Sequence, residues 1–456
     1  MIVDLRPYPK TKNSNVLWLG EVPEHWCIKK VRELAKVVNG FPFDSSLFSD
    51  SGRYPLIRIR DLNSSRTATR YGGSWIEAAR VQPGEVLIGM DGDFNVGTWA
   101  GDEPALLNQR VCCVRSGDSA SDKFLRYVLP RPLKMINDVT WSTTVRHLAS
   151  GQVERIAIAL PEEAELKAIV RFLDYANGRL ERAIRVKRKV IALLQEQKQV
   201  IIHRAVTRGL DPSVPLKASG IPWLGDIPEH WEVVRNMALF SHRVEAGVGG
   251  LPVLQVSLRS GVTPEANDQF GRPKRLISDS AKYKRIYRGD LAYNTMRMWQ
   301  GAAGVAPVDG LVSPAYVVLA PRPGASTGFY DHVFHTAFYK DQVNRHSTGI
   351  VSDRNRLYWD SFKQMPNIRV PWGEQEAIVA FIDLETRALM TAAGRLEREI
   401  DLLREYRTRL VADVVTGKLD VREVAARLPD EAPLDAVECD ADLIDETDAV
   451  DEEVVA

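Results

Sequence analysis

Residues 18–26 read WLGEVPEHW, and residues 223–231 read WLGDIPEHW. Seven of the nine positions are identical, and the other two are conservative exchanges. The match continues upstream at the same offset of 205, where Pro7, Lys12 and Ser14 correspond to Pro212, Lys217 and Ser219. A repeat at a fixed offset predicts that the chain contains two copies of one structural unit.

A second pair of matching stretches closes each copy. EAELKAIVRFLD at 163–174 matches GEQEAIVAFID at 373–383, at an offset of 209. At that same offset Thr207, Leu210 and Asp211 correspond to Thr416, Leu419 and Asp420. The middles of the two copies share only a faint pattern and differ in length by four residues. Constant ends around divergent middles predict a fixed frame that holds two variable domains.

The faint pattern in the middles is one of strands and turns. YPLIRIRDL (54–62) and LPVLQVSLRS (251–260) read as alternating strands. VQPGEVLIGM (81–90) and IYRGDLAYNT (286–295) each read as a turn with Gly and an acid, followed by a strand. We therefore expect each middle to be a mixed α/β domain, with a shared plan and different loops.

The constant ends predict two long helices. Residues 174–207 contain no Pro and a single Gly, and apolar residues recur there mostly at steps of three, four and seven. The predicted stripes are Leu173, Leu180, Ile184, Ile191, Leu194, Ile201 and Ala205, and then Leu389, Ala392, Leu396, Ile400, Leu403, Leu410 and Val414. Helices of about 34 residues would be about 50 Å long. Their stripes can pack against each other or, alternatively, each against its own neighbouring domain.

If the two equivalent helices pack through the same face, they are related by a pseudo-two-fold axis and run antiparallel. The predicted fold is thus two globular α/β domains separated by a pair of long antiparallel helices. The expected bounds are 1–161, 162–211, 212–370, 371–420 and a tail at 421–456. The separation would be comparable with one turn of DNA, about 34–36 Å.

Charge is unevenly distributed along the chain. Residues 430–456 contain twelve Asp and Glu and no Lys or Arg. Positions 1–429 therefore contain 60 basic and 48 acidic residues, an excess of positive charge. A basic body with a separable acidic tail favours an anionic partner such as nucleic acid. We expect the tail to be disordered, and either to compete with that partner or simply to be solvated.

Composition favours a soluble globular protein in the cytoplasm. Apolar residues make up 45% and charged residues 26% of the 456 residues, and no run of 18 apolar residues occurs. The N-terminus lacks the apolar core of a signal peptide. The cysteines show no metal spacing and are interpreted as buried thiols in a reducing compartment: Cys27, Cys112, Cys113 and Cys439.

The motifs of common enzyme classes are missing. Gly417-Lys418 lacks the upstream glycine of a phosphate-binding loop, and the sequence contains no G-x-S-x-G, H-E-x-x-H or Cys-x-x-Cys. An Asn-Pro-Pro-aromatic run, expected of an enzyme that methylates a base amino group, is also missing. His25 and His230 are interpreted as hydrogen-bonded structural residues beside a Trp. These absences favour a recognition protein.

The twin boxes, the two E-x-x-A-I-V-x-F-[IL]-D stretches and STTVRHL before SGQVERIAIALP resemble the specificity subunit of type I restriction-modification systems. The resemblance covers about 1–420. It implies a non-catalytic subunit whose two target-recognition domains each read one half of a split DNA site. It also implies two methyltransferase subunits that use S-adenosylmethionine on adenine N6, and motor-nuclease subunits that use ATP and Mg. No cofactor is implied for this chain itself.

We expect the loops after the shared strands to contact base edges, because Arg suits guanine and Asn or Gln suits adenine. The candidates in the first domain are Arg58, Arg60, Asn63, Arg66, Arg70, Thr143, Thr144, Arg146 and His147. Those in the second are Gln255, Ser257, Arg259, Asn294, Arg297 and Arg354. Half or more of them could instead touch only phosphates or solvent. The alternative functions are a coiled-coil adaptor that does not read DNA and a self-contained restriction enzyme.

Overall fold

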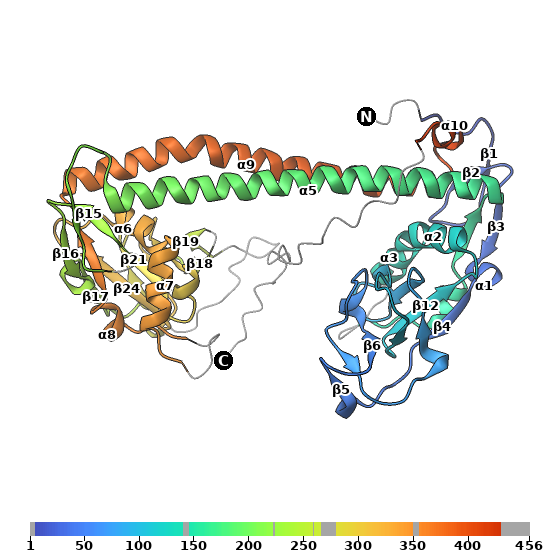
Figure 1. Cartoon of the computed structure of the whole chain (residues 1–456), viewed down its shortest axis with the longest axis horizontal. Coiled ribbons are helices and arrows are strands. Elements are labelled where there is room, and N and C mark those ends of the chain that lie inside the picture. Colours follow the sequence, from blue (N-terminus) through green and yellow to red (C-terminus); the bar gives the residue numbers. More distant parts are fainter. Residues whose placement is uncertain are drawn as a thin grey trace. The chain divides into compact units, whose positions relative to one another are not determined.

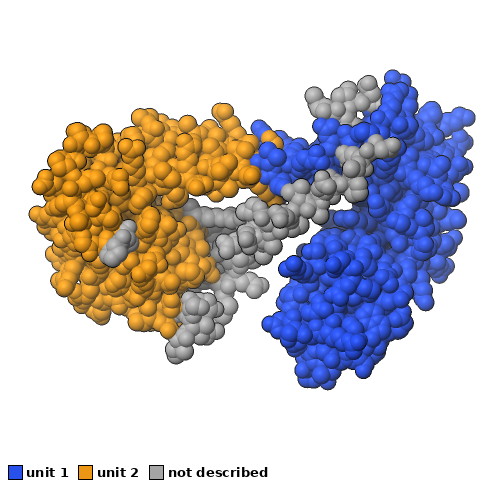
Figure 2. All heavy atoms as spheres, viewed as in Figure 1, with its two compact units in different colours: residues 1–186, 399–456 blue, residues 187–398 orange. Residues whose placement is uncertain are grey.

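The computed structural model describes residues 5–139, 146–221, 224–258, 260–265, 280–349 and 355–429. The chain is a mixed helix and sheet protein, as predicted. It divides into two compact units: unit 1 comprises residues 1–186 and 399–456, and unit 2 comprises residues 187–398 (Figure 2). The candidates Thr143, Thr144, Arg259 and Arg354 and the acidic segment 430–456 lie outside the described residues.

The core of unit 1 is an antiparallel sheet of four strands in the order β10-β9-β12-β4. Its strands are β4 (Lys36–Asn39), β9 (Val86–Gly89), β10 (Val96–Thr98) and β12 (Val111–Arg115). β12 is one of the two inner strands, and its cysteines Cys112 and Cys113 are both fully buried. Burial raises the pKa of the Cys112 thiol to about 12. Cys112 and Cys113 are thus buried as the sequence predicts, whereas the prediction is wrong for Cys27, which is exposed in a short strand, and Cys439 lies outside the described residues.

A second sheet of unit 1 has five short strands in the order β5-β7-β6-β11-β8. They are β5 (Phe48–Ser49), β6 (Tyr54–Ile57), β7 (Arg70–Tyr71), β8 (Arg80–Val81) and β11 (Ala105–Leu107). β6 is shorter than the predicted run, and its residues from Pro55 to Ile57 are all buried instead of alternating. The reason is that it lies inside the sheet, with parallel β11 on one side and β7 on the other.

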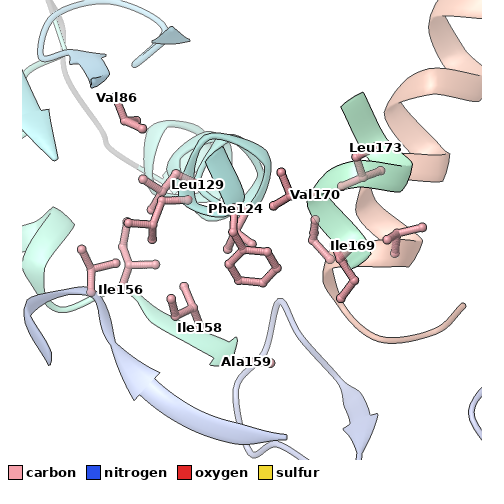
Figure 3. Close-up of a cluster of buried hydrophobic side chains, with 14 of the residues drawn as sticks. Val86, Phe124, Leu129, Ile156, Ile158, Ala159, Ile169, Val170 and Leu173 are labelled. Atoms are coloured by element: carbon pink, nitrogen blue, oxygen red, sulfur yellow. The ribbon is translucent and has the colours of Figure 1, made fainter. Parts of the chain in front are cut away.

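Short helices cover the four-stranded sheet of unit 1: α1 (Val31–Leu34), α2 (Ser119–Val128), α3 (Pro130–Val139) and α4 (Ser150–Glu154). Two further strand pairs are β1 (Thr11–Asn13) with β2 (Glu21–Pro23), and β3 (Cys27–Lys30) with β13 (Ala157–Leu160). Figure 3 shows Phe124 of α2 between Ile158 of β13 and Val170 of the long helix α5. The long helix is therefore part of the core of this unit.

Unit 2 repeats the central sheet, in the order β17-β24-β21-β22. Its strands are β17 (Phe240–Arg243), β21 (Leu291–Asn294), β22 (Ala303–Val305) and β24 (Tyr316–Pro321). The equivalent strands occur at the same places in the two copies and pair in the same order. This agreement confirms the prediction of a shared plan for the two middles.

The remaining elements of unit 2 repeat two strand pairs of unit 1, β1–β2 and β3–β13, and otherwise differ from unit 1. Four strand pairs surround the sheet: β14 (Leu216–Ala218) with β15 (Asp226–Pro228), β16 (Glu232–Arg235) with β25 (Pro366–Arg369), β18 (Leu254–Ser257) with β19 (Gly261–Pro264), and β20 (Lys284–Ile286) with β23 (Gly310–Val312). Its short helices are α6 (Thr327–Phe334), α7 (Ala337–His346) and α8 (Trp359–Phe362). Within the described residues, unit 2 has no counterpart of the five-stranded sheet.

The two predicted long helices are α5 (Glu163–Arg208, 46 residues) and α9 (Trp372–Val415, 44 residues), shown in Figure 1. They exceed the expected 34 residues because the EAELKAIVRFLD stretch and its copy are themselves helical. α5 carries Glu163 and Glu165 in its first turn, where carboxylates favour the helix dipole. Each helix contributes residues to both units. Neither they nor the other described helices are long and apolar enough to cross a membrane.

The two helices meet inside each unit. In unit 1, Glu181 of α5 forms an ion pair with Arg407 of α9, with 3.4 Å between the charged atoms. In unit 2, Lys198 of α5 lies 3.5 Å from the sulfur of Met390 of α9. The predicted stripe residues of both helices are buried or half-buried. The stripes therefore pack against protein as the sequence predicts.

In each unit, the glycine that follows the end of a long helix packs against the repeated nonapeptide. α9 ends before Gly417, which has a φ of +71° and lies against Pro23 and Trp26. α5 ends before Gly209, which has a φ of +70° and lies against Pro228 and Trp231. Glycine is favoured at both positions because a left-handed residue ends a helix.

The chain beyond α9 is ordered further than predicted. The tail was expected from 421 onward, but Arg422–Ala426 form the helix α10. Val421 and Ala425 are buried in the core of unit 1. The backbone of Asp420 forms an isolated antiparallel β-bridge with that of Arg6. The hydrophobic residues of this segment belong to the core, which is why the tail prediction was wrong for 421–429.

We expect Gly417→Ala to destabilise the protein, because a Cβ at this positive φ would overlap the ring of Pro23. A cost of about 1–3 kcal/mol is typical of such strain. The matched control is Gly394→Ala inside α9, where an added Cβ meets nothing within 4 Å. The control should raise the melting temperature slightly, since Ala is the better helix former. Equal melting temperatures for the two variants would contradict the tight fit at Gly417.

Candidate nucleic-acid interface

The candidates of the first polar loop follow β6 in a short 3-10 turn, Ile59–Asp61. Asp61 is 4% exposed, and its carboxylate accepts hydrogen bonds from the backbone nitrogen atoms of Arg58 and Ala68, at 2.9 and 3.4 Å. Arg58, Arg60 and Arg66 lie in or next to this turn and are exposed. A buried carboxylate therefore fixes the backbone of the loop while its arginines face solvent.

Asn63 joins this loop to the hairpin of β9 and β10. It has a φ of +65°, and its backbone nitrogen donates to the Thr98 carbonyl oxygen at 3.0 Å. Its Oδ1 accepts from the Thr98 nitrogen at 3.2 Å. A Cβ on Gly97 would lie 2.9 Å from the Asn63 amide nitrogen. Asn63 thus has a structural task in fixing the loop, which the sequence did not reveal.

Arg70 is also engaged within the protein. Its guanidinium donates to the carbonyl oxygens of Gly52 and Arg53 at 2.6 and 2.9 Å, and to the carboxylate of Glu103 at 3.1 Å. Three partners fix the side chain between neighbouring segments. Arg60 is less constrained, since it donates to the Thr69 hydroxyl at 2.8 Å and stays exposed.

The segment 146–148 lies beside the tip of the same hairpin. The Gly92 nitrogen donates to the Arg146 carbonyl oxygen at 3.1 Å, and the His147 Nδ1 lies 2.8 Å from Asp91 Oδ1. The Arg146 guanidinium donates to Asn137 at 3.2 Å. Asp91 also accepts from Arg110 at 2.8 Å. Arg110 is not among the sequence candidates, and it directly precedes the apolar VCCV run.

In unit 2 the hairpin of β18 and β19 takes the place of the first polar loop. Gln255 is exposed in β18 and Ser257 is its last residue. The hairpin packs on β22, where a Cβ on Gly304 would lie 2.5 Å from the Val262 nitrogen. Each unit therefore has a polar loop resting on a glycine of its central hairpin, which is Gly97 in unit 1 and Gly304 in unit 2.

Asn294 and Arg297 lie at the end of β21. Asn294 is its last residue, and its side-chain oxygen accepts from the Met296 nitrogen at 3.0 Å. Arg297 is exposed and precedes the 3-10 turn Met298–Gln300. Next to them is a hollow of about 370 Å³, lined in part by His242, Lys284, Met296, Ala315, Arg356 and Trp359.

The hollow has an aromatic wall and half-buried basic side chains. The rings of His242 and Trp359 stack, with 5.2 Å between centroids and 26° between planes. Lys284 donates to the Tyr316 carbonyl oxygen at 2.6 Å. Burial lowers the pKa of both His242 and Lys284. Aromatic faces combined with cations suit nucleotides.

Part of this chain is similar to a known protein family. Residues 23–187 match the family model described as "Type I restriction modification DNA specificity domain". This segment contains the candidate loops of unit 1, the Asp91 contacts and the first half of α5.

Curated relatives point to the same family. The chain is 36% identical over 196 residues to the type I restriction enzyme EcoBI specificity subunit of Escherichia coli, covering 42% of this chain and 41% of that protein. It is 25% identical over 240 residues to the type I restriction enzyme MjaVIII specificity subunit of Methanocaldococcus jannaschii, covering 52% and 53%. The matches thus span about half the length of these relatives.

A solved structure shares the fold over most of the chain. It comes from work described as "Structural basis underlying complex assembly and conformational transition of the type I R-M system". The match has a TM-score of 0.57 and 16% sequence identity, and it covers 87% of this chain and 99% of the other. Residues 23–187 are thus similar to type I restriction-modification DNA specificity domains, and the chain is similar in sequence to parts of type I restriction enzyme specificity subunits.

Proposed function

We propose that this chain is the DNA sequence-recognition subunit of a type I restriction-modification complex, and that it is not itself catalytic. The observation that carries the proposal is the shared sheet of the two units with unlike loops on it. One plan with two different polar surfaces suits a bipartite, asymmetric DNA site. The family match of residues 23–187 and the relatives' names support the same function.

The target-recognition domains in this proposal are residues 1–161 and 212–370, and the long-helix regions 162–211 and 371–420 separate them. The candidate DNA contacts are those predicted from the sequence, except that Asn63 and Arg70 support the loop, because their side chains are engaged within the protein. A continuous helix of 46 residues would be about 69 Å long at 1.5 Å per residue. The pairs Glu181 with Arg407 and Lys198 with Met390 support antiparallel packing, because the α9 number falls as the α5 number rises.

The partners in this proposal are two methyltransferase subunits and the motor-nuclease subunits. S-adenosylmethionine, ATP and Mg would be bound by those partners. Apolar residues that stay exposed on the long helices of unit 2 support partner binding: Val190, Leu193, Val200 and Leu384. A coiled-coil adaptor would share such a helix surface, but the DNA specificity match over residues 23–187 disfavours it.

The proposal is tested by measuring DNA binding of the full chain with its methyltransferase partner. Long-read methylation sequencing of cells that express the system supplies the modified motif. The complex should bind a duplex with this motif at least about a thousandfold more tightly than a scrambled duplex at physiological salt. Equal affinity for the two duplexes would favour the adaptor instead.

We expect Gly304→Ala to impair reading of the half-site that unit 2 contacts. The added Cβ would press on the Val262 backbone and displace the β18–β19 hairpin with Gln255 and Ser257. Overpacking of this kind typically costs about 1–3 kcal/mol. The control is Gly249→Ala, where the nearest atom to a new Cβ is 3.9 Å away. Binding to duplexes mutated in one half-site at a time reports the effect, and weakened reading of the unit 1 half-site alone would contradict it.

Shortening both long helices by matched whole heptads should shorten the unread gap of the methylated motif and leave both half-sites unchanged. Each heptad removes about 10 Å of helix, or roughly three base pairs of DNA. The motif is read by long-read methylation sequencing. Altered half-sites with an unaltered gap would show that the helices do not set the spacing.

A further inference from the structure

Asp91 organises two exposed side chains at the tip of the β9–β10 hairpin. Its Oδ2 accepts from Arg110 Nη1 at 2.8 Å, and its Oδ1 is 2.8 Å from His147 Nδ1. Asp91 is 14% exposed, whereas Arg110 and His147 are each 64% exposed. Since a carboxylate only accepts, the His147 Nδ1 carries the proton in this pair. One half-buried carboxylate thus fixes the orientation of two exposed groups.

The backbone around this cluster is fixed as well. Asp91 forms a β-bridge with His147, and the Leu148 nitrogen donates to the Met90 carbonyl oxygen at 2.7 Å. Arg110 immediately precedes β12, an inner strand of the sheet. Backbone hydrogen bonds therefore connect the three segments that carry these residues, including one from the Met90 nitrogen to the Arg110 carbonyl oxygen at 2.9 Å, and accurate base recognition requires such support.

Most of the donor capacity of Arg110 remains available. Among the described residues, its guanidinium has one hydrogen-bond partner, Asp91, and this bond uses Nη1. Nη2 and Nε remain, with the fork geometry that matches the N7 and O6 acceptors of guanine. In the neutral imidazole, His147 Nε2 stays an acceptor beside this fork.

The charges favour a base over a phosphate. Asp91 and Arg110 have opposite charges, so this pair carries no net charge. A carboxylate behind the guanidinium would repel a phosphate oxygen, whereas a guanine edge carries no net charge. Because the carboxylate also fixes the guanidinium plane, the fork can discriminate between bases.

The same place in unit 2 has different chemistry. Leu357 donates to the Thr295 carbonyl oxygen at 2.9 Å, as Leu148 does to Met90. By this register Met296, Ala315 and Arg356 stand where unit 1 has Asp91, Arg110 and His147. These three line the 370 Å³ hollow. The arginine oriented by an aspartate is thus a feature of unit 1. At the equivalent position unit 2 has the hollow.

We propose that Arg110, oriented by Asp91 beside His147, reads a guanine in the major groove of the half-site contacted by unit 1. This inference rests on the proposed function and adds a specificity-determining residue to it. In this arrangement Asp91 is a positioning residue, which acts on DNA through Arg110.

The test uses the full chain with its methyltransferase partner and duplexes carrying each of the four bases at every position of the unit 1 half-site. Arg110→Ala should abolish the preference for guanine at one position, with a roughly 5- to 150-fold loss of affinity for the native motif. Arg110→Lys keeps the charge but loses the fork, so it should relax the same position. Asp91→Ala should relax that position as well, because the guanidinium is no longer oriented.

The matched control is Arg80→Ala, which removes another exposed arginine paired with an acid, Glu77 at 3.1 Å. It should leave base preference unchanged, and melting temperatures show that all variants fold. A uniform loss of affinity for every sequence would reassign Arg110 to a phosphate and overturn the inference. Unchanged preference in Arg110→Ala would overturn it too. If the unsubstituted complex shows no base preference anywhere, the proposed function itself fails.

Discussion

The fit between the end of a long helix and the repeated nonapeptide connects the first and last parts of each unit. In unit 1, Gly417 after α9 lies against Pro23 and Trp26, and Trp26 is fully buried. The neighbouring His25 contacts Glu165 in the first turn of α5 at 2.7 Å. Glu165 also accepts a hydrogen bond from the Tyr8 hydroxyl at 2.5 Å. A buried carboxylate needs such partners, because an unpaired charge would be costly there.

Unit 2 builds the same junction with different partners. His230 contacts Glu374 at 2.8 Å, and the Trp231 indole nitrogen donates to the same carboxylate at 3.0 Å. No tyrosine is needed, because the indole supplies the second hydrogen bond. The structural role expected of His25 and His230 agrees with these contacts. The WLG-x-x-P-E-H-W box is therefore repeated because each copy joins the start of one long helix to the end of the other.

In each four-stranded sheet, an acidic side chain at the turn before an inner strand pairs with an arginine, but the arginine comes from a different strand in each unit. Glu85 in unit 1 and Asp290 in unit 2 occupy the same turn before a central strand. Glu85 pairs with Arg115 of β12, whereas Asp290 pairs with Arg243 of β17 at 2.8 Å. In both units an acid that is largely shielded from solvent pairs with an arginine from a strand of the sheet. The acid position is repeated in the sequence, but its partner comes from a different strand in each unit.

The sequence by itself determined the duplication, the two long helices and the shared plan of the middles, because these depend on periodicity and on local turn residues. The tertiary structure alone decided which polar side chains are available. Arg70 and Asn63 look like candidates in the sequence, yet both are engaged by distant backbone atoms. Arg110 looks like the flank of a buried strand, yet Asp91 holds it at the surface. The physical reason is that a polar side chain takes its role from partners far away in the chain, which only folding brings within hydrogen-bond distance.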